Sequence, residues 1–294
     1  MFFLFPCFSE CDSDLASEIR SSIDGEVYEP GTWAFDHFRL VPQGMCNRIV
    51  PAVLTRPRTV RDVSKIVRIA RARNKTISVR SGGHSYQCLS HKPHSVHLDM
   101  RSFSKVKRVS AEWSEIGTGN TWGQVREVLP KDKFTFVHGQ CLDVGVGGYL
   151  MGLGYHTPGL SNAYGVGADN ILEYELVLAD GSIARTNAHN TTIFDDAYHK
   201  PVRVVTHEQD NDLKFALRSS GNSFAIATQF TYRTLPRPEP LPIIIPVFIE
   251  DPYDLKRLHD AANKQVYTFF VLANLFFKKP KLSNVVSIER LMPK

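Results

Sequence analysis

Val79-Arg80-Ser81-Gly82-Gly83-His84-Ser85 joins the end of an expected strand to two adjacent glycines and a histidine. Successive glycines after a strand let backbone N–H groups point into one concavity, which is a geometry that binds phosphate anions. Arg80 would add a cation there, and Ser81 and Ser85 would add hydroxyl donors. An isolated Gly-Gly-His is more often a plain tight turn with an exposed histidine, so the rest of the chain has to decide between these interpretations.

The residues on either side of this stretch predict alternating helix and strand. Thr59 can cap a helix with Asp62 in a capping-box position, and apolar residues then follow at helical spacing as far as Asn74. Residues 76–79 alternate like a short strand, and a second strand fits 95–98. Residues 59–98 are therefore expected to form an α/β unit with the glycine turn at a strand end.

A second glycine cluster begins after the predicted helix 122–129 and strand 134–137. Residues 139–167 hold nine of the 19 glycines, a density that no regular helix or strand tolerates. We interpret it as close approach of the backbone to a bulky ligand. Cys141 lies at the edge of this cluster and is a candidate nucleophile or cofactor attachment point, although a lone cysteine is more often a small buried hydrophobe.

The later part of the chain predicts a hairpin, a boundary and a further unit. Strands at 171–178 and 182–186 flank Asp180-Gly181, a strong hairpin signal. A short helix at 212–217 and a strand at 224–234 follow, and prolines at 236, 238, 240 and 242 mark a boundary. Beyond it we expect a strand at 243–249, a helix at 252–264 and a buried strand at 266–277.

Composition excludes several classes of protein. The 294 residues carry a formal net charge of +5, with 43% hydrophobic and 22% charged residues, which excludes a disordered or coiled-coil chain. No apolar run is long enough for a membrane-spanning helix. The charge is too modest to imply nucleic acid, and the basic residues between Arg56 and Arg80 fit a solvated helix face.

The five cysteines, at positions 7, 11, 46, 88 and 141, show neither CxxC nor a Cys/His metal spacing, so we expect no metal site. Their odd number leaves at least one thiol free, bonded to another chain, or bonded to something that is not protein. Residues 1–8 are apolar but too short for a convincing secretory signal, so the compartment is left open, secretion included. A nicotinamide site is excluded because no glycine run satisfies G-x-G-x-x-G.

Several motifs in order carry a resemblance to one family. Val79 to Tyr86, Gly139-Gln140-Cys141 with Val144 to Gly148, and Tyr164 to Asn170 resemble the FAD-linked oxidases of the berberine-bridge-enzyme-like family. The resemblance runs from about Asn47 to Thr234. It implies an α+β fold: a two-lobed FAD-binding domain of the vanillyl-alcohol-oxidase type at 47–235, preceded by an N-terminal segment at 1–46. The start of an antiparallel-sheet substrate domain would follow at 236–294.

The resemblance also implies roles for individual residues. In this family the histidine of the SGGH motif bonds to the flavin 8α-methyl group, and the cysteine of G-x-C bonds to flavin C6 in bicovalent members, which makes His84 and Cys141 the expected attachment points. The remaining expected cofactor-binding residues are Arg80, Ser81, Gly82, Gly83, Ser85, Gly145, Gly147, Gly148, Tyr149, Gly152, Tyr155, Gly165, Asp169 and Ile226. The family reaction implies hydride transfer from a substrate C–H bond, of alcohol or carbohydrate type, to the flavin. Reoxidation by O2 follows, so the expected partners are a small-molecule substrate and O2.

The chain also departs from the family pattern. Tyr149 stands where a histidine is usual, and Leu153 interrupts a run of three glycines, so a branched side chain enters a place where the backbone should approach the ligand. The substrate-side base and the C-terminal segment of the family have no counterpart, so no catalytic base is assigned. A truncated gene model, a fragment or a degenerate paralogue would each give this pattern. Two alternative functions stay open. One is a flavin-binding remnant without turnover, and the other is a secreted binding module with an empty glycine loop.

Overall fold

The computed structural model describes residues 10–129, 134–156, 160–196, 198–208 and 212–236, together with two short strands at 244–246 and 270–272. The chain divides into two compact units, residues 1–237 and 238–294. The finer domain limits expected from the sequence stay a prediction.

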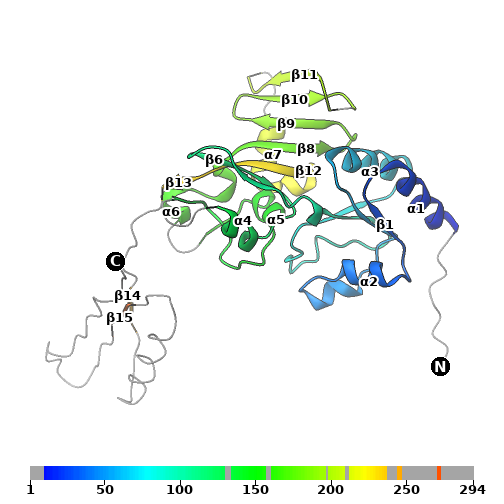
Figure 1. The fold of residues 1–294 in the computed structure, drawn as a ribbon, viewed down its shortest axis with the longest axis horizontal. Coiled ribbons are helices and arrows are strands. Elements are labelled where there is room, and N and C mark those ends of the chain that lie inside the picture. The colour runs from blue at the N-terminus through cyan, green and yellow to red at the C-terminus, as the bar shows by residue number, and fades with distance from the viewer. Residues whose placement is uncertain are drawn as a thin grey trace, which may run out of the picture. The chain divides into compact units, whose positions relative to one another are not determined.

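The first unit contains a small sheet near its N-terminal end (Figure 1). The strands in spatial order are β1 (Glu26–Tyr28), β2 (Val53–Arg56), β4 (Val96–Asp99) and β3 (Ile77–Arg80). β2, β4 and β3 are mutually parallel and β1 is antiparallel to β2. Helices α1 (Glu10–Ser22) and α3 (Val60–Ala72) pack with these strands in one apolar cluster, so the N-terminal segment forms part of this lobe.

Helix α3 forms where the sequence predicts it and for the predicted reason. The Thr59 hydroxyl accepts the Asp62 amide, and the Asp62 carboxylate accepts the Thr59 amide in return, which completes the capping box. Asp62 is buried and also accepts the amides of Asp24 and Arg58. This one carboxylate therefore ties the start of α3 to the chain that leaves α1.

A larger antiparallel sheet forms the second lobe of the same unit. Within the described residues its spatial order is β11 (Pro201–Thr206), β10 (Asn190–Phe194), β9 (Ile183–Asn187), β8 (Ile171–Leu178), β12 (Ala225–Arg233), β6 (Trp113–Gly117) and β5 (Val106–Arg108). The predicted hairpin at Asp180-Gly181 is confirmed as β8–β9, with Gly181 at a φ of +83°. Residues 190–194 and 201–206 supply β10 and β11 at the sheet edge.

Three helices cover the central part of this sheet with a second apolar cluster. They are α4 (Trp122–Val128), α5 (Val146–Met151) and α7 (Asp212–Ser220), which places the predicted helices at 122–129 and 212–217 correctly. Trp122, Leu150 and Leu217 come from these helices, and Phe230 and Tyr232 come from β12. Figure 1 shows α4 and α5 beside the β12 and β6 end of the sheet.

Strand β8 belongs to both apolar clusters because its side chains alternate between the two faces of the sheet. Tyr174 and Leu176 pack with the helices α4, α5 and α7, whereas Val177 packs with α1 and α3. Ile183 of β9 joins Val177 in the first cluster. The two lobes therefore share one sheet as a common wall.

The remaining described elements connect these layers. They are α2 (Trp33–Arg39), the 3-10 turns η1 (Gly44–Arg48), η2 (Met100–Ser102), η3 (Gly167–Asn170) and η4 (Gly221–Ser223), α6 (Leu160–Tyr164), and the pair β7 (Phe134–Thr135) with β13 (Leu235–Pro236). β7 is shorter than the strand predicted at 134–137. The α+β class predicted from the sequence is confirmed.

In the second unit the described residues form two short strands, β14 (Ile244–Pro246) and β15 (Phe270–Leu272). They lie inside the predicted strands at 243–249 and 266–277, whose other residues, like the predicted helix at 252–264, fall outside the described part of the chain. This one pair is parallel, where the sequence predicts an antiparallel sheet. The connection, residues 247–269, is long enough for the crossover that a parallel pair needs.

A buried histidine lies at the centre of the first lobe. His97 of β4 is fully buried, and its Nδ1 lies 2.9 Å from the Ser78 hydroxyl, while its Nε2 has no hydrogen-bond partner among the described residues. Burial, with the neighbouring His91 imidazole, lowers the pKa of His97 to about 3 from an ordinary 6.5. The folded chain therefore keeps His97 neutral in a range where the unfolded chain protonates it.

We expect this histidine to make the fold acid-sensitive. Between pH 6.5 and about 3 the unfolded chain takes up a proton at His97 that the folded chain does not, so stability falls as the pH falls, by up to about 1.4 kcal/mol per pH unit from this group. His97→Gln should lower stability at pH 7 but flatten the slope between pH 6.5 and 5. Urea unfolding at several pH values in that range measures the free energy of unfolding and its slope with pH. A variant slope equal to that of wild type contradicts the assignment, and the exposed His189→Ala should follow wild type.

Candidate functional site

The two glycine-bearing loops identified in the sequence meet backbone to backbone. A Cβ atom at Gly82 would overlap the Gly145 amide nitrogen, and one at Gly145 would overlap the Gly82 amide nitrogen in turn. Gly82 follows β3 in the first lobe, and Gly145 directly precedes α5 in the second. Only residues without a side chain allow this approach, and it brings the predicted attachment loops of both lobes together.

A third segment, between β6 and α4, fastens the two loops. The Ser81 hydroxyl donates to the Thr118 carbonyl at 2.7 Å, and the Gly147 amide lies 3.2 Å from the same hydroxyl and 3.1 Å from the same carbonyl. The Val146 amide donates to the Asn120 carbonyl at 2.8 Å. Sequence reasoning did not single out Thr118 or Asn120, because nothing in their local pattern shows that they lie beside Ser81.

His84 follows the tightest point of the first loop. Gly83 has a φ of +78°, and a Cβ atom there would lie 2.5 Å from Val41 Cγ1, so both the backbone conformation and the packing require glycine. His84 itself is half-buried, and its buried Nε2 has no hydrogen-bond partner among the described residues. A buried polar atom of this kind requires an explanation, and an unseen ligand is one.

Ser85 and Arg80 are turned away from the role the sequence suggests. The Ser85 hydroxyl accepts the Leu89 amide at 3.1 Å, and its carbonyl accepts the Cys88 amide. The Arg80 side chain is buried under Gly83 and donates to the Phe38 carbonyl at 2.6 Å. Both residues thus support the turn from within, where the sequence analysis had Arg80 facing an anion.

Arg80 belongs to a charged cluster at the carboxyl ends of the parallel strands. Asp99 ends β4 and accepts Arg101 at 2.6 Å, and Arg56 ends β2 with its Nε 3.5 Å from Asp99. Burial, with the neighbouring charge of Arg101, lowers the pKa of Arg80 to about 10. Burial opposes ionisation of Asp99, but the hydrogen bonds and charge of Arg101 hold its pKa below the ordinary value. Arg80 and Asp99 therefore both remain charged near neutral pH.

The second loop presents an exposed thiol. Cys141 is exposed and is the one free cysteine among those whose side chains the structure describes. The Cys141 carbonyl accepts the Val144 amide at 3.2 Å, which shapes the loop that leads to Gly145. Gly148 is exposed, and no described atom lies within 4 Å of a Cβ built on it. This side of the loop has room for a ligand.

Tyr149 points inward. Its ring packs edge-on against Trp122, with centroids 5.1 Å apart, and its buried hydroxyl has no hydrogen-bond partner among the described residues. Burial raises the pKa of Tyr149. The ring also fills the space beside Gly154, where a Cβ atom would lie 2.5 Å from Tyr149 Cε1. The phenol is thus part of an aromatic wall beneath the loop.

The interrupted glycine run is accommodated with an unusual backbone. Leu153 has a φ of +78° and is exposed, and Gly154 follows at +69°, while Gly152 is exposed. A leucine in the left-handed region costs about 1–2 kcal/mol. Tyr155 is also exposed, and its hydroxyl lies 3.5 Å from Asn162.

The remaining predicted residues lie in separate places. Gly165 has a φ of +76°, and a Cβ atom there would lie 2.6 Å from the Asp169 carboxylate. Asp169 accepts the Val166 amide and pairs with Arg218 of α7, so it supports its own loop. Ile226 of β12 packs against the first apolar cluster. The structure therefore brings Ser81, Gly82, Gly145 and Gly147 into direct contact. Gly165, Asp169 and Ile226 have local structural roles instead.

Close packing within the protein accounts for much of the glycine density. In the cluster at 139–167, the added Cβ atom would press on protein atoms at seven of the glycines, namely Gly139, Gly145, Gly147, Gly152, Gly154, Gly165 and Gly167. Gly148 alone among the cluster's described glycines has open space around it, since Gly159 lies outside the described residues. Contacts within the protein thus explain much of the glycine density, and the close approach of a ligand to this cluster stays a prediction.

Among the described residues no three His, Cys, Asp or Glu side chains are grouped so as to hold a metal ion. The helices within the same described ranges include none that is both long and apolar enough to cross a membrane.

Comparison with known proteins agrees with this geometry. Residues 51–187 match the model of the FAD binding domain family. The chain is 36% identical over 182 residues to an FAD-dependent monooxygenase of Fusarium proliferatum, covering 61% of this chain and 31% of the relative. It is 31% identical over 197 residues to the glucooligosaccharide oxidase of Sarocladium strictum, covering 64% and 34%.

Solved structures give the same picture. The BBE-like 1 protein of Physcomitrella patens superposes with a TM-score of 0.62 at 28% identity, over 75% of this chain and 44% of that one. The glucooligosaccharide oxidase of Acremonium strictum, described as carrying a 6-S-cysteinyl, 8α-N1-histidyl FAD, superposes with a TM-score of 0.61 at 25% identity, over 76% and 43%.

The fold and the matched family model define residues 51–187 as an FAD-binding domain. Together with the relatives and structures above, this makes the chain similar in sequence and in fold to the berberine-bridge-enzyme-like FAD-linked oxidoreductases. The chain covers between 31% and 44% of the length of each of these four proteins.

The contact between the two loops generates a matched pair of variants. Gly145→Ala places a methyl group onto the Gly82 backbone and the Ser81 hydroxyl, neither of which can yield without moving a loop, so we expect a loss of at least about 2 kcal/mol or failure to fold. Gly148→Ala enters open space and should change stability by less than about 1 kcal/mol. Chemical unfolding of both variants measures this. Equal stability of the two would contradict the described contact.

Proposed function

We propose that the chain binds FAD at the junction of the two glycine loops and holds it covalently through His84 and Cys141. The matched FAD binding domain model supports FAD, and the contact of Gly82 with Gly145 is the observation that carries the location. His84 lies just after Gly82, and Cys141 lies just before Gly145, so each attachment residue is close in sequence to the contact.

The residues present fit such a cofactor on three counts. The buried His84 Nε2 has no hydrogen-bond partner among the described residues, Cys141 offers an exposed free thiol, and Gly148 faces open space. Backbone N–H groups of a glycine turn suit a pyrophosphate, and the charged cluster beneath it carries more positive than negative groups. A flavin bound here would account for features that the protein's own packing leaves unexplained.

The protein's own groups have defined tasks in this proposal. Ser81 holds the two loops in register through Thr118 and Gly147, and Arg80 supports the first loop from below. Trp122 and Tyr149 form an apolar wall that keeps water from the underside of the second loop. Bound FAD supplies acceptance of a hydride from a substrate C–H bond and delivery of the electrons to O2.

An alcohol or carbohydrate is the substrate class that we propose. The matched relatives carry different activities in their names, among them a monooxygenase and a glucooligosaccharide oxidase, so the shared feature is the flavin domain. The chain matches only about a third of the length of these relatives. We propose that the residues that select among substrates lie in the unmatched remainder of such proteins.

The covalent attachment can be tested by colour. After acid denaturation and ultrafiltration, wild-type chain should keep its flavin absorbance in the retained fraction. His84→Ala and Cys141→Ala should each keep the flavin through the remaining bond, and the double variant should release it. His189→Ala, an exposed histidine distant in sequence from the loops, is the matched control and should behave as wild type. Release of flavin from wild-type chain would refute the double attachment.

Turnover is tested separately from attachment. Anaerobic mixing of the flavin-loaded chain with a panel of primary alcohols, monosaccharides and oligosaccharides should bleach the flavin absorbance for at least one member. Readmission of O2 should restore the absorbance and release H2O2. A chain that keeps its flavin but is bleached by no member of the panel would support the alternative of a flavin-binding remnant.

A further inference from the structure

The segment that carries His84 has little regular structure of its own. Residues 81–95 run from the end of β3 to the start of β4, and all of them are described, as turns, bends and irregular backbone without helix or strand. Its local hydrogen bonds from backbone amides are few, namely those of Cys88 and Leu89 to Ser85 and that of His91 to Cys88. Two local side-chain bonds join Ser90 to His91 and Ser95 to the Lys92 carbonyl. Contacts with other segments must therefore fix its shape.

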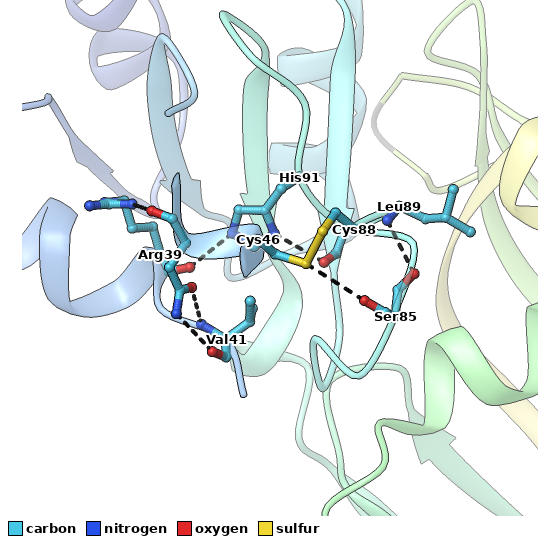
Figure 2. Close-up of a disulfide and its surroundings, with 9 residues drawn as sticks. Arg39, Val41, Cys46, Ser85, Cys88, Leu89 and His91 are labelled. Carbon is cyan, nitrogen blue, oxygen red and sulfur yellow. Dashed lines mark hydrogen bonds between the residues drawn. A yellow bond between two sulfur atoms is a disulfide. The ribbon is translucent and has the colours of Figure 1, made fainter. Parts of the chain in front are cut away.

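Those contacts converge on residues 39–50. Cys88 is joined to Cys46 by a disulfide, with a Cα–Cα distance of 5.3 Å (Figure 2). The His91 Nε2 lies 2.8 Å from the Arg39 carbonyl, and Gly83 packs on Val41. Together with the Ser81 bond to Thr118, they hold the turn from both ends.

The segment that carries Cys46, on the other side of the disulfide, is equally irregular. Residues 40–50 contain only the 3-10 turn η1 as described structure, and the side chain of Asn47 closes the segment on itself by bonding both the amide and the carbonyl of Val41, at 2.8 and 3.0 Å. Figure 2 shows Val41 and Cys46 on the strip of chain that faces the Ser85–Cys88 turn. Two irregular segments thus shape each other, and the disulfide is the covalent bond between them.

The backbone at Cys88 needs such a tie. Its φ of +55° lies in the left-handed region, which a residue with a side chain adopts at a cost and keeps only when its surroundings hold it there. Without the bond to Cys46, Cys88 is free to return to a negative φ. That change would redirect the Ser85–Cys88 turn, and with it the chain that leaves His84.

We propose that the Cys46–Cys88 disulfide is a thiol-sensitive clamp that holds the His84 turn in the shape required to take up FAD. The proposal rests on the proposed FAD site and adds a regulator to it. With the disulfide closed, the turn is pre-organised for the cofactor. With it open, the turn samples other conformations, so FAD has to bind a minor population and binds more weakly.

The opening step is thiol–disulfide exchange with a dithiol reductant. Cys46 is 1% exposed and Cys88 is half-buried, so the reductant thiolate attacks the Cys88 sulfur and displaces the Cys46 thiolate, which takes up a proton. The second thiol of the reductant then attacks the mixed disulfide and releases Cys88 as a thiol. The chain gains two electrons and two protons, and the dithiol becomes a cyclic disulfide.

FAD uptake measures the clamp directly. The full-length His84→Ala/Cys141→Ala chain, which cannot tether FAD, is freed of flavin and prepared either oxidised or treated with dithiothreitol that is then removed without air. Each form is titrated with FAD and followed by flavin fluorescence. We expect the reduced form to bind FAD at least tenfold more weakly, and Cys46→Ser/Cys88→Ser in the same background to bind like the reduced form with or without reductant. Those two serine substitutions leave Cys7 and Cys11 in place, so they also control for reduction elsewhere. Equal affinity of the oxidised and reduced chains would overturn the proposal.

Hydrogen exchange separates failure of the clamp from failure of the FAD site. In the flavin-free chain, reduction should speed exchange at the amides of Cys88, Leu89 and His91 at least tenfold, while the Asp62 amide in α3 stays protected as the internal control. If neither redox form binds FAD, the proposed function fails, and the exchange result still decides whether the disulfide holds the turn. Unchanged exchange at these three amides would refute the clamp.

Discussion

The contact between Gly82 and Gly145 constrains much of this structure. Each residue occupies the space that a Cβ on the other would need, so the loop after β3 and the loop before α5 can meet only as bare backbone. The Ser81 hydroxyl and the Thr118 carbonyl then lock the junction with directed hydrogen bonds. The half-buried His84, the exposed Cys141 and the open face of Gly148 all lie within a few residues of that contact. The FAD site that we propose lies where these two chain segments touch.

Local signals in the sequence were sufficient for much of the secondary structure. Thr59 and Asp62 determine the start of α3 because a capping box acts over three residues, and Asp180-Gly181 determines the β8–β9 turn because only a few residue types accept a positive φ. The ordered glycine motifs also located the two loops correctly. In each case the interaction is made within a few residues, where the sequence itself shows both partners.

Side-chain direction could not be predicted in this way. Arg80 and Tyr149 both turn inward, since the Phe38 carbonyl and the Trp122 ring that receive them are distant in sequence. The glycine density was assigned to a ligand, whereas Gly147 and Gly167 make room for Thr118 and Leu150. The pairing of Cys46 with Cys88 was equally invisible, because five cysteines allow many pairings and only the fold brings these two within bonding distance.

The shared position of β8 has a mechanical consequence. Val177 faces one apolar core and Leu176 faces the other, so pulling the lobes apart would strip apolar surface from both sides of a single strand. The two lobes are therefore expected to unfold together, because neither apolar core can lose this strand without exposing the other.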